Sequence, residues 1–249
     1  MKSLLLIFFW GLPVFSIAQS PVPLARPFAL VELFTSQGCS SCPPAHQMLD
    51  KFSNDSSFGT DSVAIISFHV DYWNYLGWED SFSRHTFTER QKEYSTVFGD
   101  ENVYTPQLVV NGKSGFSGNN EARLRRELKA IQHGVKYEST GLEITSLKLN
   151  GDKLIFSYLP GKKVRNHSIN ATLVSIADTT VVAAGENSGS TLTSKNTVRA
   201  FLKLPMREEG SRAFLNIPVD EDKSRLRLIV WIQSLQEGGI MDIQVFDLP

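Results

Sequence analysis

The chain contains two cysteines, and they lie two residues apart at Cys39 and Cys42. A pair at this spacing can close a disulfide across one helical turn and open it again. The loop that it closes is so short that it removes little chain entropy, which makes it a poor structural staple. The pair therefore favours thiol–disulfide exchange. Cys39, at the start of a helix, is the expected attacking thiolate because the helix dipole lowers its pKa, and Cys42 is the expected resolving thiol.

Strand and helix patterns alternate over residues 28–137, around the two cysteines. Their order is β-α-β-α-β-β-α, and with a two-residue cysteine spacing after the first strand it predicts a thioredoxin-like α/β domain. The expected elements are a strand over 28–34, a helix over 43–52, a strand over 63–70, a helix over 82–97 capped by Ser81 or Ser83, strands over 105–110 and near 115–116, and a helix capped by Asn119 or Asn120.

The pattern changes over residues 138–249, where short alternating strands recur between turn signals. That rhythm predicts a second, antiparallel all-β domain that resembles a sandwich. The polar connection over 185–190 either closes a turn, folds back on the redox face or docks a partner. The expected strands of this domain lie over 142–149, 153–158, 171–177, 180–184, 197–204, 213–219, 226–233 and 240–246.

Two further candidates follow from the predicted fold. Thr105-Pro106 opens the third strand, where a thioredoxin-like domain carries a cis proline beside the cysteines, so Thr105 could pair with an extended substrate segment. Glu32 is a charge inside a strand that looks buried. A carboxylate there could act as the general base for the resolving thiol. Alternatively, Glu32 faces solvent or pairs with a lysine.

His69, Asp71, Trp73 and Trp78 gather where the second strand ends. The carboxyl ends of adjacent strands in an α/β sheet face the ligand crevice, so this group should lie near Cys39. It could form a substrate-recognition wall or assist proton transfer. Equally, the aromatic residues could simply pack a long connection.

Two alternatives to exchange chemistry remain open. Cys39 and Cys42 could hold Cu(I) or Zn(II) together with His46 or His69, because thiolates suit soft ions. The spacing of the cysteines counts against such a metal carrier, since copper-delivery proteins of this kind usually have three residues between them. The chain could also be a binding module whose disulfide is inert. We expect no cofactor.

Several stretches resemble a family of exported bacterial proteins, DUF1223, which is grouped with the thioredoxin-like fold. The resemblance implies that fold, and it implies little about the substrate because the family lacks an established activity. The stretches that carry it are Val-Glu-Leu-Phe-Thr-Ser-Gln-Gly-Cys-Ser-Ser-Cys-Pro-Pro at 31–44, Phe-His-Val-Asp-Tyr-Trp at 68–73, Leu-Gly-Trp at 76–78, Tyr-Thr-Pro-Gln at 104–107, Gly-Glu-Asn at 185–187 and Asn-Thr-Val-Arg at 196–199.

The N-terminus has the form of a secretory leader. Lys2 precedes an apolar run over residues 4–17, and Ser16-Ile17-Ala18 suits signal-peptidase cleavage after Ala18. Residues 1–18 are thus the expected signal peptide and 19–27 a linker. The run is short for spanning about 30 Å of hydrocarbon, so no stable membrane span is expected after cleavage. The mature chain should be periplasmic or secreted.

The overall charge narrows the class of partner. The formal net charge is −1 at pH 7, so no basic field favours nucleic acid. Protein or small-molecule thiols and disulfides are the expected substrates. The redox partner that an exchange enzyme requires is not identified by the sequence.

Overall fold

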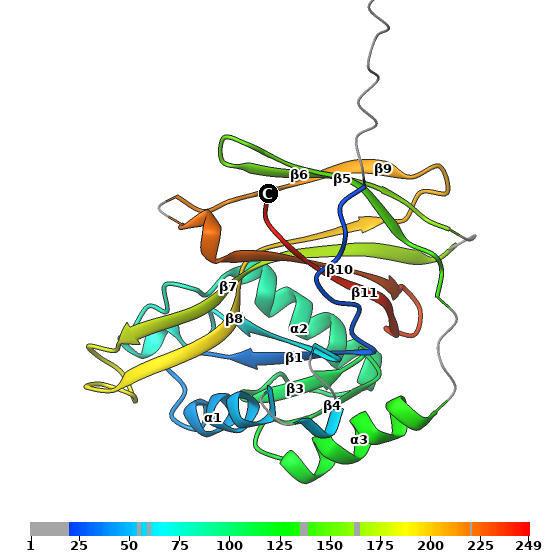
Figure 1. Ribbon diagram of the computed structural model, residues 1–249. Helices are drawn as coiled ribbons and strands as arrows, with labels where there is room; N and C mark the ends of the chain where they lie inside the picture. The colour runs from blue at the N-terminus through cyan, green and yellow to red at the C-terminus, as the bar shows by residue number, and fades with distance from the viewer. Residues whose placement is uncertain (1–19, 54–55, 59–60, 135–138, 162–164, 220) are drawn as a thin grey trace, which may run out of the picture.

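Strands from both halves of the chain pair in one sheet (Figure 1). The structure is a computed structural model that describes residues 20–249 except 54–55, 59–60, 135–138, 162–164 and 220. Its larger sheet has eight strands in the order β11-β10-β7-β8-β2-β1-β3-β4. These strands are β1 (Ala29–Thr35), β2 (Val63–His69), β3 (Gln107–Val110), β4 (Ser114–Ser117), β7 (His167–Val181), β8 (Thr191–Pro205), β10 (Leu226–Ser234) and β11 (Ile240–Asp247).

A smaller antiparallel sheet has the order β5-β6-β9 and lies at the top of Figure 1. Its strands are β5 (Glu143–Asn150), β6 (Lys153–Leu159) and β9 (Ser211–Asn216). The described residues also form α-helices α1 (Cys42–Ser53), α2 (His85–Phe98) and α3 (Glu121–His133), with 3₁₀ helices at Ser56–Phe58, Asn74–Leu76 and Lys223–Arg225. None of these helices is long and apolar enough to cross a membrane.

Strand β1 is buried on both faces, and its side chains alternate between two cores. Val31 and Leu33 pack against α1 and α3, which lie below the strand in Figure 1. Leu30 and Phe34 point to the opposite face, which α2 covers. The face on which a β1 residue lies therefore decides whether it can reach the cysteines at the start of α1.

The long hairpin of β7 and β8 joins the two halves of the chain. Each of its strands has 15 residues, and β8 lies next to β2. Ser67 of β2 is in parallel register with Thr197 of β8, and the Asn196 side chain donates a hydrogen bond to the Ile65 carbonyl at 2.9 Å. The sheet therefore continues without a break from the first half of the chain into the second.

The predicted fold class, an α/β thioredoxin-like domain followed by a separate all-β domain, is wrong. The described structure is mostly β, with eleven strands, a mixed eight-stranded sheet that both halves share, and three helices of 12 to 14 residues. Hydrophobic alternation indicates that a strand is half-buried, but it does not specify which strand lies beside it. No local feature of the sequence indicates that β8 pairs with β2.

Two expected element boundaries also differ from the structure. Residues 180–184 do not form a strand of their own, because β7 continues to Val181. Helix α2 begins at His85, and neither Ser81 nor Ser83 caps it, since the Ser83 hydroxyl donates to the Asp80 carbonyl at 2.8 Å. For α3 the structure selects Asn120, whose side chain accepts from the Arg123 N–H.

The expected signal peptide, residues 1–18, and the expected domain boundary at residues 137–138 lie outside the described residues. The first described residues, from Ser20 onward, run along the second half of the sheet. The Leu24 N–H donates to the Val245 carbonyl at 2.7 Å, and Ala25 forms a bridge with the same residue of β11.

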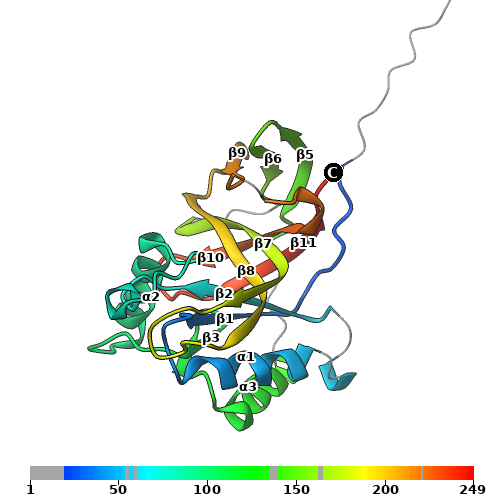
Figure 2. The same ribbon diagram turned by 90° about the vertical axis from the view of Figure 1, so that its left-hand side faces the viewer.

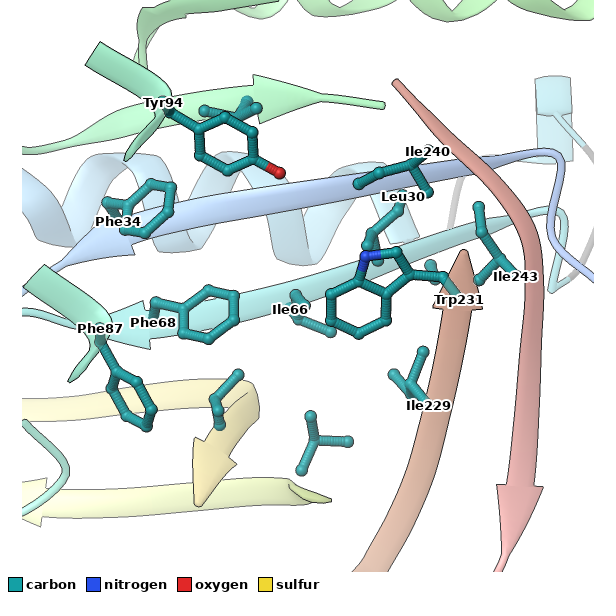
Figure 3. Packing of buried hydrophobic residues seen from close by; sticks show 14 of the residues in the cluster. Leu30, Phe34, Ile66, Phe68, Phe87, Tyr94, Ile229, Trp231, Ile240 and Ile243 are labelled. Carbon is teal, nitrogen blue, oxygen red and sulfur yellow. The ribbon is translucent and has the colours of Figure 1, made fainter. Parts of the chain in front are cut away.

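Three hydrophobic clusters hold these layers together. One lies between β1–β3 and helices α1 and α3, and a second lies between the two sheets. The third fills the space between β1 and β2, helix α2, and strands β10 and β11, with Trp231 at its centre (Figure 3). Trp231 is fully buried, and the ring of Phe201 stacks on it at 6.1 Å between centroids.

A buried ion pair lies at the edge of this third cluster. The Arg90 guanidinium of α2 donates to the Glu32 carboxylate of β1 at 2.7 Å, and both side chains are almost completely buried. Tyr94 donates to the second oxygen of Glu32, and Gln233 of β10 accepts from Arg90 at 3.2 Å. The guanidinium also lies over the rings of aromatic side chains from four elements, Phe68 of β2, Tyr94 of α2, Phe201 of β8 and Trp231 of β10.

Removing one member of this pair should be costly. Arg90→Met leaves the Glu32 carboxylate buried without its cation, so the free energy of unfolding should fall by about 3–5 kcal/mol in urea titrations of the oxidised protein. Adding Glu32→Leu should recover part of the loss by removing the uncompensated charge. Lys203→Met is the control, because its half-exposed pair with Glu93 on the same helix should contribute under about 1 kcal/mol. Equal effects of Arg90→Met and the control would contradict the prediction.

Candidate functional site

Cys39 and Cys42 are joined in a disulfide at the start of α1, with their Cα atoms 5.4 Å apart. The turn that carries them is held by its own backbone. The Cys39 N–H donates to the Ser36 carbonyl at 3.2 Å, and the Cys42 N–H donates to the Cys39 carbonyl at the same distance. The helix can begin directly at Cys42 because Pro43 and Pro44 occupy its first turn, where an N–H has no intrahelical partner.

Both half-cystines are buried. Cys39 is 0% and Cys42 1% exposed, whereas Ser40 and Ser41 between them are exposed. The Ser41 hydroxyl lies 3.4 Å from the Cys39 sulfur, and its carbonyl accepts from Asn119 in the loop before α3. Access to the disulfide is therefore set by what packs around the turn.

The connection between β7 and β8, residues 182–190, packs on the cysteine turn; we call it the hairpin tip. The buried Asn187 side chain donates to the carbonyls of Gln37 and Cys39, at 2.8 and 2.9 Å. The Glu186 carboxylate accepts from the Ser40 N–H at 3.1 Å. Hydrogen bonds from the Ser40 side chain and backbone hold the pKa of Glu186 below its usual value. A negative charge is thus kept beside Cys39.

His69, the last residue of β2, pairs with Asp80. Its Nδ1 lies 2.7 Å from the Asp80 carboxylate, which also accepts from the Gln37 N–H at 2.8 Å. Burial alone would raise the pKa of Asp80, but the His69 ring and two backbone N–H groups lower it below its usual value. The ionised Asp80 therefore fixes the proton on Nδ1 of His69. The other ring nitrogen, Nε2, is buried and has no hydrogen-bond partner in the structure.

His46 lies one turn into α1 and faces the same region. Its Nε2 is 3.0 Å from the Thr35 hydroxyl, and its ring centroid is 6.1 Å from that of His69. Burial and the neighbouring His69 lower the pKa of His46 to about 3. The two histidines therefore form a pair in which His46 is neutral at physiological pH.

A cavity of about 240 Å³ lies between α1 and the first residues of β8. Ile65, Ser67 and His69, which alternate along β2, form its floor because they share the face that α1 covers. Cys42 and His46 contribute its α1 wall. The opposite wall consists of residues 191–196. Figure 2 shows the far end of the β7–β8 hairpin beside α1.

The predicted aromatic residues lie around the cysteine turn. Trp73 donates to the Thr105 hydroxyl at 2.8 Å, and its Cβ would be 3.4 Å from a Cβ at Gly38. Trp78 donates to the Gln37 side chain at 2.9 Å. The Thr105-Pro106 bond is cis, as the sequence predicted. These residues fix the turn to the segment after β2 and to the start of β3.

Two predicted residues lie elsewhere. Asp71 accepts from the Thr88 hydroxyl at 2.5 Å and from His85 at 3.1 Å, so it organises the start of α2. Burial opposes ionisation of Asp71, but these hydrogen bonds outweigh it and lower its pKa. Glu32 points to the face of β1 opposite α1, where Arg90 and Tyr94 occupy its oxygens. No described contact brings either carboxylate to the cysteines.

The described residues give no support to a metal centre. No three His, Cys, Asp or Glu side chains among them are arranged to hold an ion. His46 and His69 do lie near Cys42, as the metal hypothesis required, but both sulfurs are in the disulfide.

Residues 30–233, which include the cysteine turn, the segment after β2 and the hairpin tip, match a family described as a protein of unknown function, DUF1223. The chain belongs to the DUF1223 family. No curated protein matches it.

Two solved structures resemble this DUF1223 protein. The crystal structure of protein AGR_C_4864 from Agrobacterium tumefaciens has a TM-score of 0.64 and 26% identity, covering 88% of this chain and 94% of that one. HBP35 of Porphyromonas gingivalis has a TM-score of 0.61 and 13% identity, covering 91% of this chain and 77% of that one. At 13% identity, the second likeness shows the fold alone.

Sequence reasoning missed two residues of this DUF1223 site. Asp80 follows the aromatic segment as one of several polar residues, and nothing in its spacing indicates that it returns to His69. Asn187 lies 148 positions after Cys39 in a connection with an ordinary turn composition. The Gly185-Glu186-Asn187 stretch was a usable signal, since folding back on the redox face was one of its expected roles.

The hairpin tip should control access to Cys39. Asn187→Ala removes two hydrogen bonds to the turn, so alkylation of reduced Cys39 by iodoacetamide should become about tenfold faster, the equivalent of about 1.4 kcal/mol. Ser188→Ala is the matched control, because Ser188 is exposed and donates within the tip to Ala183 at 3.2 Å. An unchanged rate in Asn187→Ala would show that the tip does not restrict access.

Proposed function

We propose that this DUF1223 protein is a thiol–disulfide oxidoreductase whose redox pair is Cys39 and Cys42. The observation that carries the proposal is the place of the disulfide at the start of α1, where Cys42 lines a cavity that His69, the partner of Asp80, also lines. Exchange requires a sulfur that can leave or attack as a thiolate and a group that moves the thiol proton. Both are present.

The surroundings of Cys39 suit a thiolate. Its sulfur lies at the N-terminal end of α1, where the helix dipole favours negative charge, and the Ser41 hydroxyl is 3.4 Å away. Glu186 opposes this effect, because its carboxylate is bound to the adjacent Ser40 N–H. The balance between the two sets the thiol pKa and hence the reduction potential.

A purely structural role explains the pair less well. The loop that the disulfide closes spans three positions, from Cys39 to Cys42. Loop-closure entropy for a ring of this size stabilises a fold by about 2 kcal/mol, against about 3 for fifteen residues. The turn is already held by Asn187 and by the backbone bonds of Ser36. We therefore assign the disulfide a redox role and not a structural one.

The expected setting is outside the cytoplasm. The leader-like N-terminus supports a periplasmic or secreted protein, and an oxidising compartment would keep the pair as the disulfide until a reductant reaches it. Its substrates are then protein or small-molecule thiols and disulfides, with a separate partner that restores the starting redox state.

A redox titration of the mature chain tests the proposal. Free thiols are trapped with a maleimide across a gradient of reduced to oxidised glutathione, and the modified protein is counted by mass. A reversible two-electron transition between about −120 and −270 mV, the range of known exchange proteins, is the expected result. The Cys39→Ser/Cys42→Ser double variant gives the background. A disulfide that stays closed below about −300 mV would mark the pair as structural and overturn the proposal.

A further inference from the structure

On the basis of the redox function proposed above, we infer that the cavity between α1 and β8 binds a low-molecular-weight thiol, which reacts at Cys42 with His69 as its base. Cys42 contributes to the cavity wall, whereas Cys39 does not. Cys39 is instead covered by the hairpin tip, through Asn187 and Glu186. The accessible sulfur of the disulfide is therefore that of the second cysteine. In an exchange protein whose first cysteine attacks, the accessible sulfur is that of the first.

The size of the cavity selects the kind of substrate. Its volume of about 240 Å³ is below the 300–1,000 Å³ of ordinary ligand pockets. A thiol of a few non-hydrogen atoms fits, and a folded protein cannot present its cysteine there. The rim carries Lys195 and Asp50, which form an ion pair with each other, so it favours a thiol without a large net charge.

His69 supplies the general base that the reaction requires. Asp80 holds the proton on Nδ1, so Nε2 carries a lone pair, and this nitrogen is buried and unpartnered beside the cavity. An unpartnered buried nitrogen is costly in a folded protein unless a ligand or water satisfies it. His46 does not compete for the proton because its own pKa is about 3.

The reaction balances without a further reagent. The incoming thiol gives its proton to Nε2 of His69, and the thiolate sulfur bonds to the Cys42 sulfur. The Cys39–Cys42 bond breaks, and its electron pair leaves on Cys39, beside the Ser41 hydroxyl. A second molecule of the same thiol attacks the sulfur of the first, the bond to Cys42 breaks, and its electron pair stays on the Cys42 sulfur. A symmetric disulfide is released, and the two protons of the small thiols end on the reduced cysteines. The protein is thereby reduced by two electrons and the small thiol is oxidised.

Single-cysteine variants identify the reacting sulfur. Treated with hydroxyethyl disulfide, Cys42 in the Cys39→Ser protein should form the mixed disulfide at least tenfold faster than Cys39 in the Cys42→Ser protein, measured by mass spectrometry. The opposite order, or equal rates, would overturn the inference.

Blocking the cavity tests the route without touching its polar groups. Gln47 is an exposed residue of α1 at the cavity, so Gln47→Trp should slow reduction of the wild-type disulfide by 2-mercaptoethanol at least tenfold. Lys51→Trp, exposed on the same helix and outside the cavity lining, is the control and should leave the rate unchanged. Equal rates for the two variants would overturn the route.

The base is tested with two thiols of different acidity at one pH. His69→Gln should slow reduction by 2-mercaptoethanol about a hundredfold, the usual contribution of a general base. Reduction by an aromatic thiol, which is already ionised, should change little. Asp80→Asn, at the positioning residue, should show the same selectivity. Equal losses with both thiols would indicate a structural effect and overturn the role of His69.

Failure here is separable from failure of the redox function. A reversible glutathione titration together with preferential reaction at Cys39 would leave the oxidoreductase in place and refute the small-thiol cavity. A disulfide that resists reduction below about −300 mV would refute both.

Discussion

The fold depends on one buried charge pair. Arg90 of α2 and Glu32 of β1 neutralise each other at the place where α2, β1, β8 and β10 converge. Neither charge could remain in that apolar environment alone. Each element that meets there must therefore keep its position, and the halves of the chain are bound by electrostatics as well as by the shared sheet. Because Arg90 binds Glu32 on the face of β1 opposite the cysteines, Glu32 cannot act as the base for a cysteine thiol, and another residue must do so.

The candidate site is assembled from segments that are distant in sequence. Helix α1 supplies the disulfide, β2 supplies His69, and the loop after it returns Asp80 to the histidine. The β7–β8 hairpin then contributes both the far wall of the cavity and the cover over Cys39. The second half of the chain is therefore part of the site, because without it the cysteine turn would be open to solvent on both sides.

Local features of the sequence were sufficient for local structure. The cis bond at Pro106 and the order of the first-half elements around the cysteines were predictable, since turn chemistry and hydrophobic period act over a few residues, although the start of α2 was not. The pairing of β8 with β2 was not, because it joins residues about 130 positions apart and edge pairing has no periodic signature. For the same reason, nothing in the sequence indicates that Arg90 is buried. Its aromatic partners come from α2 itself and from β2, β8 and β10.

The hairpin tip is synthesised long after the two cysteines that it covers. Asn187 follows Cys39 by 148 positions, so both cysteines are synthesised well before the residue that will enclose them. Oxidation by an external catalyst can therefore act on an open turn early in biogenesis. Once β8 has paired with β2, a reagent can reach the disulfide only through the openings that the folded protein leaves.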